Sequence, residues 1–222
     1  MSPPRWRSCL VASPRLPTSH EPGTEAHKPP GVLSVFGARK GRLAMADPRF
    51  GTTGGHLGAM QAAWGPERYG RWLDGLVANQ IAVLTSGNAG VVEGVASGEF
   101  DLGMTDTDDV WAAREQGLAV ELVYPRHEPG TVPGGGTLLI PNTVGIIRGA
   151  ANPESAHALA AWLASPEVEG LLRDSPSRNI PIRSDPGALQ VPDPLKVELE
   201  RAALQRVEAL EAARQRGLLQ SG

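Results

Sequence analysis

Two adjacent acids, Asp108 and Asp109, stand where a short apolar stretch ends, in the run FDLGMTDTDDVWAA. The run predicts a buried strand that leads into a helix N-terminus, the place where α/β proteins bind ligands. Carboxylate oxygens are hard ligands for cations, and a helix N-terminus favours negative side chains. Asp106, just before them, is most simply a helix cap. Two further acids exceed what capping requires.

Two other polar loops could join this site. The loop FGTTGGH contains Gly51–Gly54, whose small residues and hydroxyls let backbone N–H groups approach an anion, although an ordinary turn is an equal alternative. It lacks the Gly-Lys-Ser/Thr ending of a Walker A loop. In the loop SGNAG, Asn88 is most simply a helix cap. If the strands are parallel, all three loops converge at one sheet edge and form one cleft.

The elements that must position these loops alternate along the chain. Apolar patterning predicts strands at 42–46, 81–84, 101–105 and 120–124, and helices at 56–64, 66–79, 88–97 and 108–116. This alternation predicts a mostly parallel sheet with covered faces. Residues 137–148 are expected to be extended, and helices are expected to begin near Pro153, Pro166 and Pro194. The last should run to Arg216 and pack through Leu195, Leu199, Ala203, Val207 and Leu210.

Composition narrows the possible functions. The net charge of −3 over 222 residues gives no basic face for nucleic acid. No apolar run approaches the roughly 18 residues of a membrane helix, and a single cysteine, Cys9, excludes an internal disulfide and a Cys-rich zinc site. Residues 1–31 are rich in Pro, Ser and Arg, which predicts disorder, and their apolar run 9–12 is too short for a secretory signal.

An enzymatic alternative rests on the same acids. The run DTDDV, Asp106–Val110, fits the haloacid-dehalogenase pattern, in which one Asp attacks phosphorus, a second acts as acid and base, and Mg²⁺ offsets the charge. That chemistry also needs a downstream lysine and a later acidic pair after a strand. Only Lys196 lies downstream, and no such pair follows. No serine lies in a Gly-x-Ser-x-Gly elbow.

A family resemblance covers about residues 40–183. The segments GRLAMADPRFGTTGGHLGAM, SGNAGVVEGVASGEFDLGMTDTDDVWAA, LLIPNTVGIIRGAANPESAHALAAWLASPEVEGLL and SRNIPIR follow one another in an order and spacing that resemble the extracellular solute-binding proteins of bacterial ABC importers. The most similar branch looks like the ferric-ion-binding type. The resemblance implies ligand capture in a cleft between two lobes, without chemical turnover.

The resemblance also implies a fold and a division of the chain. The fold class is α/β, a type II periplasmic-binding-protein-like lobe with a parallel or mixed sheet plus a helical remnant of the other lobe. Residues 1–40 would be a disordered, non-homologous segment, 41–130 the ligand-binding lobe, and 131–222 the hinge strand and C-terminal helices of an incomplete first lobe. The family's N-terminal lobe should precede Gly41, so the chain is expected to be truncated.

The resemblance assigns roles to the candidate residues. Ferric binders of this family place a tyrosine pair where Asp108 and Asp109 stand, so these two are the expected metal ligands, with the identity of the metal open. The bound solute would be a metal ion, Fe³⁺ with a synergistic anion as one candidate, or a small anionic solute; no catalytic cofactor is expected. The other expected ligand-binding residues are Gly51, Thr52, Thr53, Gly54, Asn88 and Thr107.

Partners and location follow from the same resemblance. The partner would be an ABC importer permease, with no nucleic acid and no membrane insertion, and the chain would be a monomer if it folds. The family works in the periplasm or outside the cell. A third possibility is that the chain does nothing alone, because half the cleft is absent. The helices from 153 would then expose apolar faces and make the chain poorly soluble.

Overall fold

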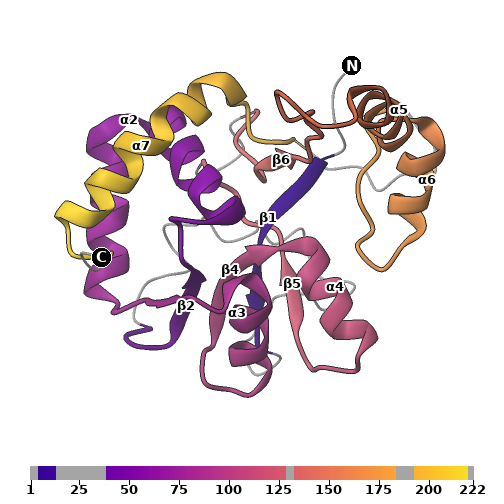
Figure 1. Ribbon diagram of the computed structural model, residues 1–222. Helices are drawn as coiled ribbons and strands as arrows, with labels where there is room; N and C mark the ends of the chain where they lie inside the picture. The colour runs from indigo at the N-terminus through magenta and orange to yellow at the C-terminus, as the bar shows by residue number, and fades with distance from the viewer. Residues whose placement is uncertain (1–4, 14–38, 129–132, 184–192, 220–222) are drawn as a thin grey trace.

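A six-stranded sheet forms the centre of the protein (Figure 1). The computed structural model describes residues 5–13, 39–128, 133–183 and 193–219. Five strands run side by side in the order β3-β2-β4-β1-β5, and the sixth, β6, pairs with another part of β1. The strands are β1 Arg5–Ala12, β2 Leu43–Ala46, β3 Ala82–Leu84, β4 Leu102–Asp106, β5 Glu121–Val123 and β6 Leu139–Pro141.

Strand directions make the sheet mixed. Strands β3, β2 and β4 are parallel, whereas β1 runs antiparallel to β4, β5 and β6. The prediction of an α/β lobe with a parallel or mixed sheet is therefore confirmed. The parallel group brings the C-terminal ends of β2, β3 and β4 to one edge, and each of these strands is followed by a helix.

Strand β1 corrects the prediction of disorder for residues 1–31. Residues 5–12 form the strand between β4 and β5, and Ser8–Ala12 face Leu102–Asp106 of β4. The prediction fails because β1 takes its backbone hydrogen bonds from strands that lie far along the sequence, and a local pattern carries no trace of them. The other residues of that segment, 1–4 and 14–31, lie outside the described residues.

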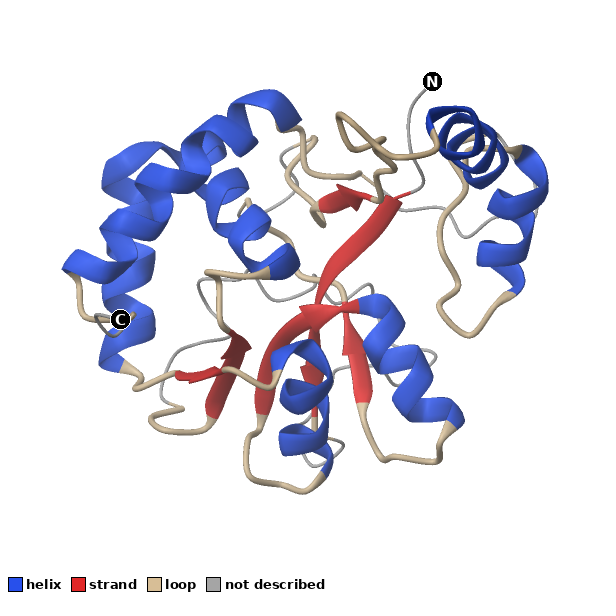
Figure 2. Cartoon of the chain, in the orientation of Figure 1, coloured by secondary structure: helices blue, strands red, loops and turns tan. Residues whose placement is uncertain are grey.

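Helices cover both faces of the sheet (Figure 2). In β2, Leu43 and Met45 face one core, which includes residues of α2 and α7, and Ala44 and Ala46 face the other, which is filled by α3 and α4. This alternation is the period-two pattern of a strand that is buried on both sides. The helices are α2 Gly51–Ala78, α3 Gly87–Ala96, α4 Thr107–Glu115, α5 Pro153–Leu163, α6 Pro166–Asp174 and α7 Leu199–Gln215.

Helix α2 joins two helices that the sequence predicts separately. It begins at Gly51, five residues earlier than predicted, and it is broken at Gly65, which has φ 72° and ψ 168°. Pro66 opens the second half, where its missing N–H costs nothing. The loop Gly51–Gly54 is therefore the first turn of a long helix.

The predicted packing of the last helix is only partly confirmed, because Leu195 and Leu210 pack against the core but the buried face of α7 differs from the predicted stripe elsewhere. This helix lies along α2 and buries Ala202, Ala209 and Ala213, whereas Val207 is 75% exposed. The predicted helix began near Pro194, but the observed helix begins at Leu199. Its packing partner, α2, lies within the predicted 41–130 lobe.

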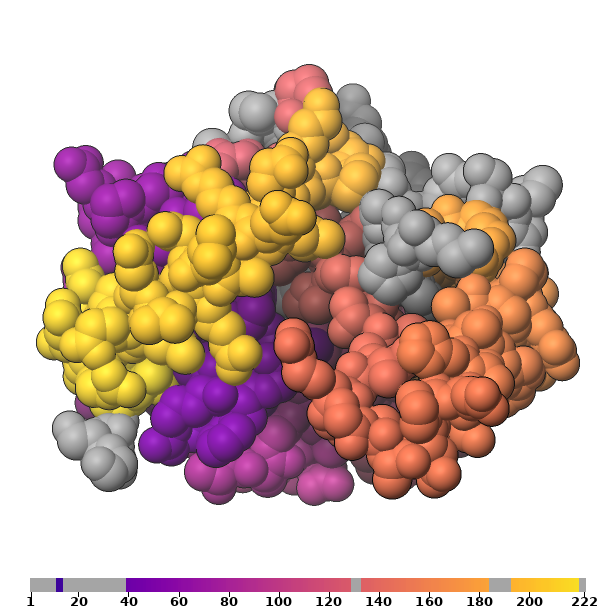
Figure 3. Space-filling model, turned by 45° about the horizontal axis from the view of Figure 1, so that its top comes forward, coloured from indigo at the N-terminus to yellow at the C-terminus, as the bar shows by residue number. Residues whose placement is uncertain are grey.

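Helices α5 and α6 lie at the end of the molecule opposite α2 and α7 (Figure 1). The surface is hollowed between the yellow side formed by α7 and the orange side formed by these two helices (Figure 3). Only three residues of the predicted extended stretch 137–148 form a strand, β6. Among the described residues, no helix is both long and apolar enough to cross a membrane. The division of the chain at residue 130 stays a prediction.

Candidate functional site

Three side chains from three strand-to-helix connections meet through hydrogen bonds. Thr52 lies in the first turn of α2, Asn88 in the first turn of α3, and Asp106 at the end of β4. The Thr52 hydroxyl donates to Asp106 Oδ2 over 2.5 Å, and Asn88 Nδ2 donates to the same oxygen over 2.9 Å. The loops therefore meet at one sheet edge, as the parallel strand order predicts.

These contacts correct the predicted capping roles. Asp106 is the extended residue that precedes α4, but its side chain makes no capping hydrogen bond and accepts from Thr52 and Asn88 instead. Asn88 lies inside α3, after Ser86 at the N-cap. Asp106 is buried, so its carboxylate finds its donors on neighbouring elements, which a local capping pattern does not reveal.

Asp106 joins the two predicted metal ligands in one acidic cluster. One carboxylate oxygen from each of Asp106, Asp108 and Asp109 lies within 4.8 Å of the others. Asp108 Oδ1 is buried and has no hydrogen-bond partner among the described residues. The sequence analysis predicted only Asp108 and Asp109 as metal ligands. The position of Asp106 at the end of the strand could have identified it as the third, but it was interpreted as a helix cap.

Burial and mutual repulsion shift these carboxyl groups toward the protonated form. Burial raises the pKa of Asp106 to about 6, even though the hydrogen bonds from Thr52 and Asn88 oppose the shift. Burial, followed by repulsion from Asp109 and Asp106, raises the pKa of Asp108 to about 7. Burial also raises the pKa of Asp109. A bound cation would relieve both the repulsion and the lost hydration.

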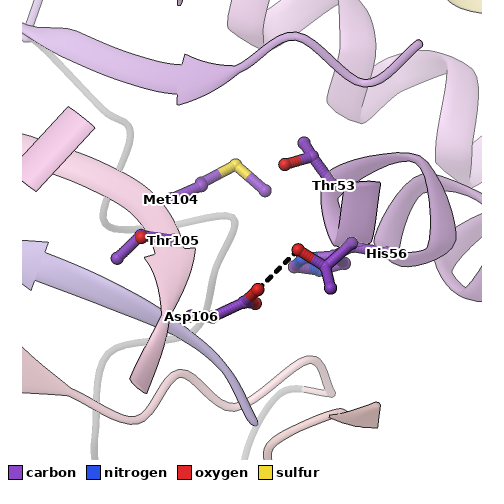
Figure 4. A pocket seen from close by; sticks show the side chains of 6 residues that line it. Thr53, His56, Met104, Thr105 and Asp106 are labelled. Carbon is purple, nitrogen blue, oxygen red and sulfur yellow. Dashed lines mark hydrogen bonds between the residues drawn. The ribbon is translucent and has the colours of Figure 1, made fainter. Parts of the chain in front are cut away.

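Two hollows flank the first turn of α2. One lies next to Asp106 and is lined by Thr52, Thr53, His56 and residues 104–106 of β4 (Figure 4). The other, about 120 Å³, lies between the ends of β2 and β3 and includes Asn88. Thr52 and Thr53 line both hollows, so this turn is central to the site.

The remaining predicted residues lie in different surroundings. Gly51 has φ 58° and borders the larger hollow. A side chain on Gly54 would strike the Pro48 carbonyl and the Arg206 guanidinium, so this glycine faces α7 and is needed for close packing. Thr107 is buried and opens α4. His56, where the predicted helix 56–64 begins, is a buried residue that lines the hollow beside Asp106.

Solved structures share this fold. Iron-bound HitA from Pseudomonas aeruginosa is 21% identical, with a TM-score of 0.74 over 98% of this chain and 69% of that one. A ferric binding protein from Campylobacter jejuni is 16% identical, with a TM-score of 0.76 over 98% and 70%. AfuA from Actinobacillus pleuropneumoniae, with fructose-6-phosphate bound, is 19% identical, with a TM-score of 0.75 over 99% and 68%.

The family assignment comes from a separate comparison. No curated protein matches the chain significantly. A model of the bacterial extracellular solute-binding protein family matches residues 9–175. The match begins inside β1, so it includes residues 9–40 of the segment that was expected to be non-homologous. With most of its length matched, and with three strand ends converging on one polar site, the chain belongs to the bacterial extracellular solute-binding protein family, whose role is solute capture for ABC importers.

Proposed function

We propose that this chain captures a metal ion at the cluster formed by Asp106, Asp108 and Asp109, with Fe³⁺ as the first candidate. The observation that carries the proposal is the meeting of three carboxylates at the sheet edge, one of which leaves a buried oxygen without a partner among the described residues. Carboxylate oxygens are hard donors and suit hard, highly charged cations. No catalytic step is part of this function.

The charge of the site favours a cation over an anionic solute. Structures of similar fold hold different ligands, since HitA is iron-bound and AfuA holds fructose-6-phosphate. A sugar phosphate would meet three carboxylates here, and like charges at such distances repel strongly in a partly buried site. The acidic cluster therefore distinguishes between the two kinds of ligand, whereas the fold does not.

An accompanying anion would bind at the first turn of α2. Phe50 provides no side-chain cap and no acid lies in that turn, so the N–H groups at Gly51, Thr52 and Thr53 are suited to an anion. The Thr52 hydroxyl already donates to Asp106, which leaves backbone N–H groups and Thr53 as the expected contacts. Gly54 contributes through packing rather than contact with the ligand.

The physiological setting follows the family. The proposed partner is an ABC permease, and the proposed place of action is outside the cytoplasmic membrane. The phosphatase alternative has no support, because the matched family consists of solute-binding proteins.

Titration with ferric citrate, followed by calorimetry and by absorbance, tests the proposal. The double change Asp108→Ala and Asp109→Ala should weaken Fe³⁺ binding by more than about 100-fold, since loss of outer-shell partners alone costs 10–100-fold. Folding should survive, because both carboxylates are held in an environment that disfavours their charge.

Asp101→Asn is the matched control. Asp101 precedes the other end of β4 and pairs with Arg42 at the surface, so its loss should leave metal binding unchanged. Equal affinity of the wild type and the double variant would refute the metal role. Calorimetry with fructose-6-phosphate tests the anionic alternative, which is favoured if that ligand binds and Fe³⁺ does not.

A further inference from the structure

The first half of α2 is held in place from two directions. On one side Thr52 donates to Asp106, which ties the first turn to the end of β4. One turn further along the helix, His56 Nε2 lies 3.0 Å from His127 Nε2, in the connection after β5. Side chains at i and i+4 lie on the same helix face, and Thr52 and His56 line the same hollow. The histidine contact and the site contact therefore act on one short segment.

The hydrogen-bond direction within the histidine pair follows from its surroundings. His127 Nδ1 lies 2.9 Å from the Gly136 carbonyl oxygen, which can only accept, so the proton of His127 is on Nδ1. His127 Nε2 is then an acceptor, and His56 Nε2–H donates to it. Burial lowers the pKa of both rings, so neither is charged at neutral pH.

The connection after β5 also binds the second half of α2, through hydrogen bonds from Arg68. Arg68, beyond the break at Gly65, donates to both carboxylate oxygens of Glu128 at 2.8 and 2.7 Å and to the His127 carbonyl at 3.1 Å. Its guanidinium lies 4.7 Å from the ring centre of Trp64, the last residue before the break. Two consecutive residues, His127 and Glu128, thus span the break, and we call them the clasp.

We propose that the clasp is a positioning device for the ligand site: by bridging the two halves of α2 across Gly65, it fixes the first half so that Thr52 reaches Asp106. A helix broken at a glycine can change its bend angle, and Gly65 tolerates the backbone conformation that this requires. A small rotation at Gly65 moves the far end of the first half, where Thr52 lies. Neither His127 nor Glu128 lines either of the two hollows at the site, so the proposed effect acts through α2. This inference rests on the proposed function only for its binding readout.

The test compares His127→Phe with His127→Gln. Phe keeps a ring but loses the acceptor for His56, whereas the Gln amide oxygen can still accept that hydrogen bond. His127→Phe should shift the Thr52 methyl resonance in the NMR spectrum and weaken Fe³⁺ binding, measured with ferric citrate, by about tenfold. His127→Gln should restore both to wild-type values.

Two further variants make the result decisive. Glu128→Ala removes the grip on Arg68 without leaving a buried donor at His56, and it should shift the Thr52 resonance even if His127→Phe fails to fold. Val95→Ala destabilises the core on the other face of the sheet, formed with Val91 and Phe100, and should leave the Thr52 resonance unchanged.

The outcomes separate the two proposals. If the wild type binds no Fe³⁺, the proposed function is refuted. The clasp is then tested by the Thr52 resonance alone. An unmoved Thr52 resonance in both clasp variants would overturn the inference. The same holds if Val95→Ala reproduces their effect, since general loss of stability would then explain it.

Discussion

At the scale of single residues, the main feature of the site is that Asp106 is buried beside two other acids, Asp108 and Asp109. A buried carboxylate needs donors, and Thr52 and Asn88 supply them from two neighbouring elements. Those donors offset only part of the cost, since the pKa of Asp106 still lies at about 6. Sites that perturb carboxyl groups in this way trade stability for function.

A pH-dependent stability follows for Asp106→Asn. The folded pKa of about 6 lies above the ordinary 3.8, so ionisation of Asp106 destabilises the folded protein. The cost is absent below pH 4, grows as the pH rises from 4 to 6, and is complete above that range. Asn keeps an acceptor for Thr52 and Asn88, so the variant should be more stable by roughly 1–3 kcal/mol at pH 8.

Urea denaturation of the metal-free protein at pH 8 and pH 4 measures this effect. The pH 4 experiment is an internal control, because Asp106 is then protonated in the folded state and most of its ionisation cost is absent, so the two proteins should differ little. A stabilisation of the same size at both pH values would show that loss of charge is not its cause.

At the scale of elements, helix α7 packs along α2. Tyr69 of α2 donates its hydroxyl to the Ala209 carbonyl over 3.1 Å, and α7 turns small alanines toward α2. A side chain on Gly58 would strike the Ala202 backbone carbonyl. The backbones lie too close for leucine or valine, which explains why Val207 faces outward although the apolar stripe predicted the reverse.

Gly58→Ala and Gly75→Ala should therefore have opposite effects on stability. Glycine to alanine within a helix normally stabilises by about 0.5–1 kcal/mol, and Gly75 has open space around its Cα. At Gly58 the new methyl group meets backbone that cannot give way, so the variant should lose about 1–3 kcal/mol. Thermal denaturation of both variants and the wild type measures these two changes in stability. Stabilisation by both would mean that α7 does not press on Gly58.

At the scale of the whole molecule, apolar side chains remain exposed at the end opposite α2. Helix α5 has no buried residue, and Leu159 and Trp162 are 54% and 49% exposed. Ile147, in the segment that leads to α5, is 80% exposed. Exposed apolar surface of this kind favours self-association, so the expectation of poor solubility stays a prediction with a structural basis.

Trp162→Lys should reduce that self-association. Sedimentation velocity over a range of protein concentrations should show a smaller proportion of assembled species for this variant than for the wild type. Ala158→Lys is the matched control, because it adds the same charge one turn earlier on α5 but removes little apolar surface. If the control has the same effect as Trp162→Lys, charge rather than apolar contact governs association.

The sequence by itself determined the local elements and the edge at which they place their polar residues. Apolar periodicity located β2, β3, β4 and the helices that follow them, because a strand or helix needs only a pattern over neighbouring residues. Parallel order then brought Thr52, Asn88 and the acids to one edge, since three strand ends of one direction must meet there. The family resemblance came from the order of these same segments.

The tertiary structure alone decided the contacts between distant segments. Only the fold shows that Asp106 is the shared acceptor of Thr52 and Asn88, that β1 completes the sheet, and that His127 grips His56. Each depends on partners tens of residues away, and several side-chain roles satisfy the same local pattern. Long-range packing determines which hydrogen-bond partners are within reach of each segment. It therefore decides the roles of Asp106, of residues 5–12 and of His56.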